Sequence, residues 1–220
     1  AEGGTWVASA PKPTPPPAPA EYAQMLDGQT NCALRSGGVF IRAVNLTITN
    51  WSDDEMYVKW MKGTKPYDRK GRIPPSGGAT VCADPVLGED QAYAYTDIGF
   101  GQAPIERQGG SGLGGIQRID LWNPWIGKPY VSMSIIDATG ANKDLILESN
   151  EGEGKAMAWA DKYFFLTRNN DDSCGNGGPG AGEICWSLVI SRLPNGVQNG
   201  MTWQWGGGRE TVGPDPLPRP

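Results

Sequence analysis

Hydrophobic and polar residues alternate over most of the middle of the chain, a pattern typical of strands that bury one face. Residues 39–52 place Val44, Leu46 and Ile48 on one face and Asn45 and Thr47 on the other, with many β-branched side chains. The period of two recurs at 55–62, 79–83, 90–98, 115–122, 130–137, 143–149, 163–168, 184–192 and 201–205. The sequence therefore predicts about ten short strands.

Turn residues separate these segments, notably at 73–78, 137–142 and 193–200, where Gly, Pro and Asn are concentrated. Because only the short turn Ser52–Asp54 divides the first two segments, we expect them to be neighbouring antiparallel strands. The only helix candidates are 21–26 and 154–162, both short. We therefore predict an all-β protein whose domain, residues 21–205, is an antiparallel β-sandwich.

Both ends of the chain differ from this pattern. Residues 1–20 are rich in proline, which favours extended polyproline II geometry, and residues 206–220 form a second arm rich in Gly and Pro. An extended segment with one aromatic anchor suits insertion into a partner's groove or sheet edge. We predict that the first arm binds a partner protein through Trp6, Val7, Pro11, Pro13, Pro15, Pro16 and Pro17. The alternative is that both ends are disordered tails.

Four cysteines occur without a CxxC pair and without any histidine, so two disulfides are the economical interpretation. The loop between Cys174 and Cys185 favours a bridge closing it, which leaves Cys32 with Cys82; the other pairings stay open. Disulfides imply an oxidising compartment. The chain also begins at Ala1, as expected after removal of a secretory signal, so we expect a secreted, extracellular protein.

Composition argues against several functions. The net charge is −5 with no basic run, unlike a nucleic-acid binder, and no segment approaches 18 apolar residues, unlike a transmembrane helix. Without histidine no Ser-His-Asp or Cys-His machinery can form, so we expect no enzyme activity, no cofactor and no metal. A carboxylate glycosidase using Glu148, Glu151 and Glu153 stays a minor alternative to a solvated loop. Residues 169–172 offer oxygen ligands, but they lack the glycine and glutamate of an EF-hand loop.

Aromatic side chains mark two candidate ligand sites. Trp122, Asn123 and Trp125 surround Pro124 in a turn that can display a stacking surface for a sugar, a lipid headgroup or a protein. Tyr93 and Tyr95 share one face of their strand by its period of two. Each set has the alternative of packing in the core, with Trp125 expected to be the more exposed of the two tryptophans.

Residues 39–137 resemble aegerolysin-like and crystal-toxin-like β-sandwich proteins. The resemblance lies in LTITNWSDDEMYVKW, in GRIPPSGGATVCA and, most specifically, in IDLWNPWIGKPYVSMSI with its aromatic-Asn-Pro-aromatic-x-Gly segment. It implies a jelly-roll or aegerolysin-like sandwich and toxin-type binding without catalysis. The proline-rich arms, the cysteines and the longer C-terminal half depart from that family.

We therefore expect a secreted, non-catalytic structural or adaptor subunit of an extracellular toxin-type complex that engages other protein subunits. The alternative is a self-sufficient lipid- or carbohydrate-binding module of aegerolysin type, with cytolysis as one outcome.

Overall fold

Strands dominate the computed structural model of the chain. It describes residues 20–26, 28–30, 43–62, 69–83, 92–101, 115–123, 130–136, 142–148, 153–169 and 183–205. Within these ranges the helical content is a single 3-10 turn, η1 (Ala20–Tyr22), followed by a short extended stretch. The all-β class is confirmed, while the assignment to a jelly-roll or aegerolysin-like sandwich stays a prediction.

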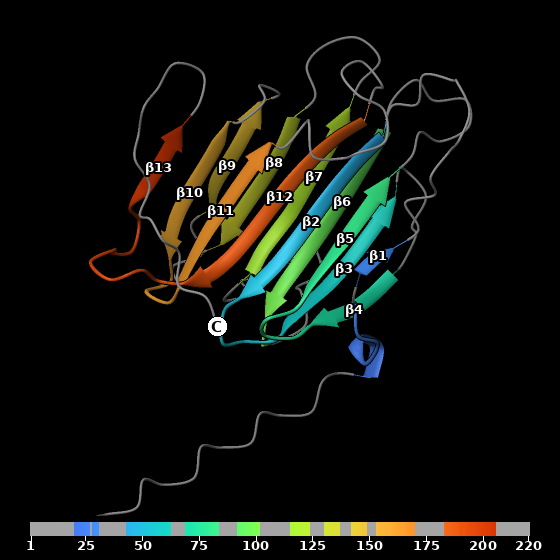
Figure 1. Cartoon of the computed structure of the whole chain (residues 1–220), viewed down its shortest axis with the longest axis horizontal. Helices are drawn as coiled ribbons and strands as arrows, with labels where there is room; N and C mark the ends of the chain where they lie inside the picture. The colour runs from blue at the N-terminus through green and yellow to red at the C-terminus, as the bar shows by residue number, and fades with distance from the viewer. Residues whose placement is uncertain are drawn as a thin grey trace, which may run out of the picture.

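The strands form two sheets, which overlie one another in Figure 1. The six-stranded sheet has the order β4 (Arg69–Ile73), β3 (Met56–Lys62), β6 (Ala92–Phe100), β7 (Gly115–Asn123), β8 (Tyr130–Ile136) and β9 (Asn142–Glu148). The seven-stranded sheet has the order β1 (Gly28–Thr30), β5 (Gly78–Ala83), β2 (Ala43–Trp51), β12 (Glu183–Arg192), β11 (Tyr163–Asn169), β10 (Gly154–Trp159) and β13 (Thr202–Trp205). Pairing is antiparallel except between β1 and β5 and between β12 and β2.

One apolar core joins the two sheets. Leu46 and Ile48 of β2 belong to the same buried cluster as Leu121 of β7 and Met133 of β8, and none of the four is exposed to solvent. In each strand two residues in alternation enter the cluster (46 and 48, 119 and 121, 131 and 133), as expected for a strand with one buried face. A smaller apolar cluster lies around Phe164, which belongs to the opposite face of the seven-stranded sheet.

Two expectations about the strands were wrong, and two strands were missed. β2 and β3 are not neighbours, because the turn between them leads from one sheet to the other. Residues 154–159 are strand β10 and not a helix, because their backbone groups pair with β11 and β13 on both sides. Strands β1 and β4 were not predicted, since GQT and RKGRI have too few apolar residues to show a period.

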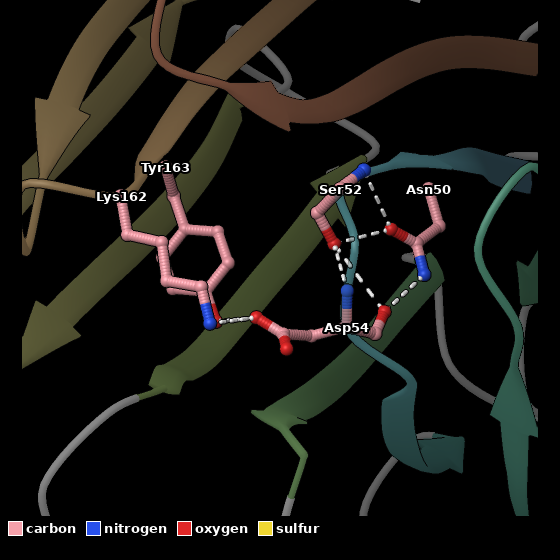
Figure 2. Close-up of polar contacts among 5 residues, drawn as sticks. All are labelled: Asn50, Ser52, Asp54, Lys162 and Tyr163. Atoms are coloured by element: carbon pink, nitrogen blue, oxygen red, sulfur yellow. Dashed lines mark hydrogen bonds and ion pairs between the residues drawn. The ribbon is translucent and has the colours of Figure 1, made fainter. Parts of the chain in front are cut away.

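The turn after β2 is organised by Asn50, whose side chain is fully buried. Its amide nitrogen donates to the carbonyl oxygens of Asp54 (2.8 Å) and Ile73 (3.0 Å), and its amide oxygen accepts from the Ser52 amide (3.0 Å) and hydroxyl (2.7 Å). Figure 2 shows the part of this network between residues 50 and 54. Every polar atom of the side chain is thereby satisfied, which is the condition for burying an amide.

The backbone of Asn50 adds a second connection at the same place. Its amide donates to the Gly77 carbonyl oxygen and its carbonyl oxygen accepts from the Ser76 amide, both at 2.8 Å. Residues 74–77 connect β4 to β5 and so also lead from one sheet to the other. Asn50 therefore fastens together two of the connections that cross between the sheets, β2 to β3 and β4 to β5.

We predict that Asn50→Ala lowers the free energy of unfolding by about 3 kcal/mol or more, because it leaves several buried donors and acceptors without partners. Asn50→Asp, of nearly the same shape, should destabilise at least as much, since an oxygen would then face two carbonyl oxygens. Ser52→Ala, which removes one hydroxyl, should lower it by about 1 kcal/mol. Urea unfolding measures all three, and an Asn50→Asp variant as stable as the parent would contradict this role.

Candidate functional site

Residues 20–26, which follow the proline-rich arm, are packed against the six-stranded sheet. Tyr22 and Leu26 are only 4% and 3% exposed. The Tyr22 ring meets the Tyr57 ring edge-on, with centroids 5.7 Å apart, and Leu26 enters the main core. Two side chains of such size bury enough apolar surface to hold a short segment in place. We call residues 20–26 the root of the arm.

Backbone hydrogen bonds attach the root to the edge strand β4. The Leu26 amide donates to the Arg72 carbonyl oxygen (2.7 Å), and the Arg72 amide donates to the Gln24 carbonyl oxygen (2.9 Å). Gly71 makes this approach possible, because a Cβ atom there would lie 2.5 Å from Leu26 Cγ and 2.8 Å from the Gln24 oxygen. The root thus occupies the hydrogen-bonding edge of β4, which would otherwise be open to another chain.

A surface ion pair adds to the attachment. Lys70 Nζ lies 2.9 Å from Glu21 Oε2, and its hydrogen bond and charge lower the pKa of the Glu21 carboxyl. Lys70 also lies 6.0 Å from the centre of the Tyr22 ring. Exposed pairs of this kind contribute little stability, so burial of Tyr22 and Leu26 is the main attachment.

The predicted aromatic site is brought together in part. Trp122 is half-buried and meets the Tyr130 ring edge-on, with centroids 5.1 Å apart. Trp122 lies between Tyr93 of β6 and Tyr130 of β8 in the strand register, so the three positions form one row across the sheet. Leu121 next to Trp122 is in the core, so this row belongs to the outer face of the six-stranded sheet. We call Tyr93, Trp122 and Tyr130 the aromatic row.

Sequence reasoning missed Tyr130, although it begins the next predicted strand, because its register with Trp122 cannot be read from the sequence. Tyr95 lies in the neighbouring row, opposite Asp120. The structure describes the backbone but not the side chains of Tyr93, Tyr95 and Asn123. Trp125 lies outside the described residues.

The first-arm residues predicted to bind a partner also lie outside the described residues, as do Cys32 and Cys174. Cys185 is nearly buried and disulfide-bonded, and its sulfur accepts a weak hydrogen bond from Asn45 Nδ2 at 3.7 Å. In the strand register Asn45 lies between Cys185 and Cys82. Cys185 and Cys82 therefore lie two strands apart, about 10 Å, which is too far for a direct disulfide between them. The register is compatible with the predicted pairing of Cys185 with Cys174.

A polar cluster that the sequence did not predict forms around Asp54, in the turn that follows β2. The Tyr163 hydroxyl donates to Asp54 Oδ2, and Lys162 Nζ lies 2.6 Å from the same oxygen. Figure 2 shows both side chains reaching the Asp54 carboxylate from the β10–β11 hairpin. This contact ties the hairpin of the seven-stranded sheet to the turn that enters the six-stranded sheet.

The hairpin carries backbone strain at this point. Ala160 and Asp161 have φ angles of 56° and 52°, in the left-handed region, and the Lys162 amide closes the turn on the Trp159 carbonyl oxygen at 3.2 Å. Such turns match the twist of the flanking strands but favour Asn or Gly. The tight turn brings Lys162 and Tyr163 to Asp54.

Aromatic rings surround Tyr163 on its other side. Its ring stacks on Phe100 with centroids 4.5 Å apart and lies 5.7 Å from Trp159. Burial, and after it the hydrogen bond to Asp54, raises the pKa of the Tyr163 hydroxyl well above its ordinary value. The hydroxyl therefore stays protonated and donates to Asp54. The cluster connects the β10–β11 turn to the turn that follows β2.

Two absences concern the described ranges only. Nowhere in them do three His, Cys, Asp or Glu side chains gather as metal ligands. In the same ranges no helix is long and apolar enough to span a membrane. The chain matches no protein-family model, and a search of curated proteins also finds no match. The resemblance to aegerolysin-like proteins accordingly stays a prediction.

The raised pKa of Tyr163 predicts a loss of stability at alkaline pH. In the unfolded chain the hydroxyl ionises near pH 10, whereas in the folded chain it keeps its proton. Stability from this residue is complete below about pH 10 and falls above it by up to about 1.4 kcal/mol per pH unit. Urea unfolding between about pH 9 and pH 11 should give a shallower decline for Tyr163→Phe. Equal slopes for the parent and the variant would contradict the buried hydroxyl.

Proposed function

We propose that the protein is a secreted, non-catalytic adaptor subunit of an extracellular toxin-type complex, and that its N-terminal arm engages a partner protein. The observation that carries this proposal is the root. Buried Tyr22 and Leu26, with two backbone hydrogen bonds to β4, fix the position of the segment that directly follows residues 1–19 in the chain.

A fixed point of departure has a consequence for binding. An extended arm that binds another protein loses conformational freedom, and anchoring one of its ends reduces that loss. The root also occupies the outward backbone groups of Arg72 on β4, so a partner would be recruited by the arm and not by pairing at that position. The position of Trp6 and Val7 about 15 residues before the root would allow an extended arm to reach about 45 Å from the domain.

Removing residues 1–19 is the direct test. We expect native mass spectrometry after size exclusion, on material purified from the source, to find co-purifying chains with the full protein and none with the truncated one. Thermal unfolding should be unchanged, because the root and the domain stay intact. A matched variant lacking residues 206–220 controls for the loss of any proline-rich end. A truncated protein that keeps its partners would overturn the proposal.

A second candidate function has its own observation. The aromatic row lies on the outer face of a sheet, and Trp122 with Tyr130 is half-buried and not part of the core. Flat aromatic surfaces stack on sugar rings and insert into lipid headgroups. This favours a lipid- or carbohydrate-binding module of aegerolysin type, in which the aromatic row makes the contact.

Binding to liposomes and to a glycan array tests this second function. We expect Trp122→Ala to reduce binding at least tenfold, the effect of losing one buried aromatic anchor. Trp203→Ala is the matched control, since Trp203 packs on Phe164 on the outer face of the other sheet, with centroids 5.3 Å apart. Equal binding by the parent and Trp122→Ala, or no binding by the parent, would contradict this function.

A further inference from the structure

The inner face of the seven-stranded sheet changes character along its length. Near the β10–β11 hairpin it is aromatic and apolar, with Trp159, Phe165 and Ile190 in the core. Towards the opposite end of the same strands, the inward positions of β11 are Thr167 and Asn169. Polar residues at inward positions need partners, since the apolar core supplies none.

Three inward residues of β11 and β12 carry buried polar atoms without a partner. Asn169 and Thr167 are fully buried, and within the described part of the chain Asn169 Oδ1, Asn169 Nδ2 and Thr167 Oγ1 meet no hydrogen-bond partner. The same holds for Nε1 of Trp186, which lies directly opposite Asn169 in the strand register. Each such atom destabilises the fold unless something binds it.

A cation lies next to these residues. Lys155 occupies the inward position of β10 directly opposite Thr167, so their Cβ atoms are about 5 Å apart. Its side chain is half-buried, and across the ranges that the structure describes no carboxylate comes within ion-pair distance of it. Lys155, Thr167, Asn169 and Trp186 thus place one ammonium and three hydrogen-bond donors on neighbouring rungs of three adjacent strands.

We infer that Lys155, Thr167, Asn169 and Trp186 form a binding site for an oxyanion, the carboxylate or phosphate group of a small ligand. The oxygen atoms of such a group would accept hydrogen bonds from the Lys155 ammonium and from the side-chain N–H and O–H groups of the other three residues. The charge-assisted bond from Lys155 is the strongest of these. Asn169 Oδ1 can accept from a hydroxyl of the same ligand. The inference is independent of the arm and of the aromatic row.

The route of entry follows from burial. Thr167, Asn169 and Trp186 have almost no contact with solvent, whereas Lys155 reaches it. A ligand would therefore enter beside Lys155, whose flexible stem can follow it. Glu153 precedes Lys155 by two residues. Its backbone carbonyl oxygen accepts a hydrogen bond from the backbone amide of Asn169 at 2.9 Å, which holds this end of β11.

NMR titration of the full chain tests the site. The probes are sodium acetate and sodium phosphate, each compared with sodium chloride at equal ionic strength. We expect saturable shifts of the Trp186 indole N–H and the Asn169 side-chain amide, with Trp186→Phe used to assign the indole signal. Saturation by acetate identifies a carboxylate ligand, and saturation by phosphate a phosphate ligand. The absence of saturation by either salt in the parent protein would overturn the inference.

Variants locate the binding. Lys155→Met should weaken it by about tenfold or more, as expected for the loss of one charge-assisted hydrogen bond. Lys70→Met makes the same charge change on the edge strand β4 of the other sheet and should leave the affinity unchanged. Equal weakening by Lys155→Met and Lys70→Met would show a general charge effect and would overturn the site.

Discussion

The buried side chain of Asn50 is the constraint on which the arrangement of the two sheets depends. Its amide holds the turn that leaves β2 and, through Ile73, the end of β4, so it sets where the second sheet starts relative to the first. The apolar core alone does not specify this, because hydrophobic contact is non-directional and tolerates sliding. Four directional bonds from one buried amide do specify it, since each would be lost on displacement.

The position of β4 in turn decides what the N-terminal segment can do. With β4 held at the edge of the six-stranded sheet, its free backbone groups receive the root, and Tyr22 and Leu26 fill the adjoining hydrophobic positions. The root, which follows the arm directly in the sequence, is thereby attached to a paired strand. The proposed adaptor function uses this geometry, whereas the aromatic row and the proposed oxyanion site belong to other faces of the same scaffold.

The sequence predicted the all-β class and most strands because one buried face imposes a period of two. It failed where pairing depends on partners distant in the chain. Residues 154–159 look helical by composition and become a strand because β11 and β13 lie on either side. The turn at Ser52 looks like a hairpin, but β2 and β3 lie in different sheets, and buried Asn50 bonds to both sides of this crossing. Trp122 was recognised as a candidate. Its register with Tyr130 could not be predicted, and neither could the Asp54 cluster nor the position of Lys155 beside Thr167, because each depends on tertiary contacts.

Hydrogen exchange of two amides tests most directly the claim that the root is part of the folded domain. The Leu26 and Arg72 amides are the donors of the two bonds between the root and β4. In the full chain we expect both to exchange as slowly as the amides of β3, and in Gly71→Ala, whose Cβ displaces Leu26, both should exchange much faster while β12 stays protected. Fast exchange of Leu26 in the parent protein would contradict the account, because the arm would then leave from a loose end.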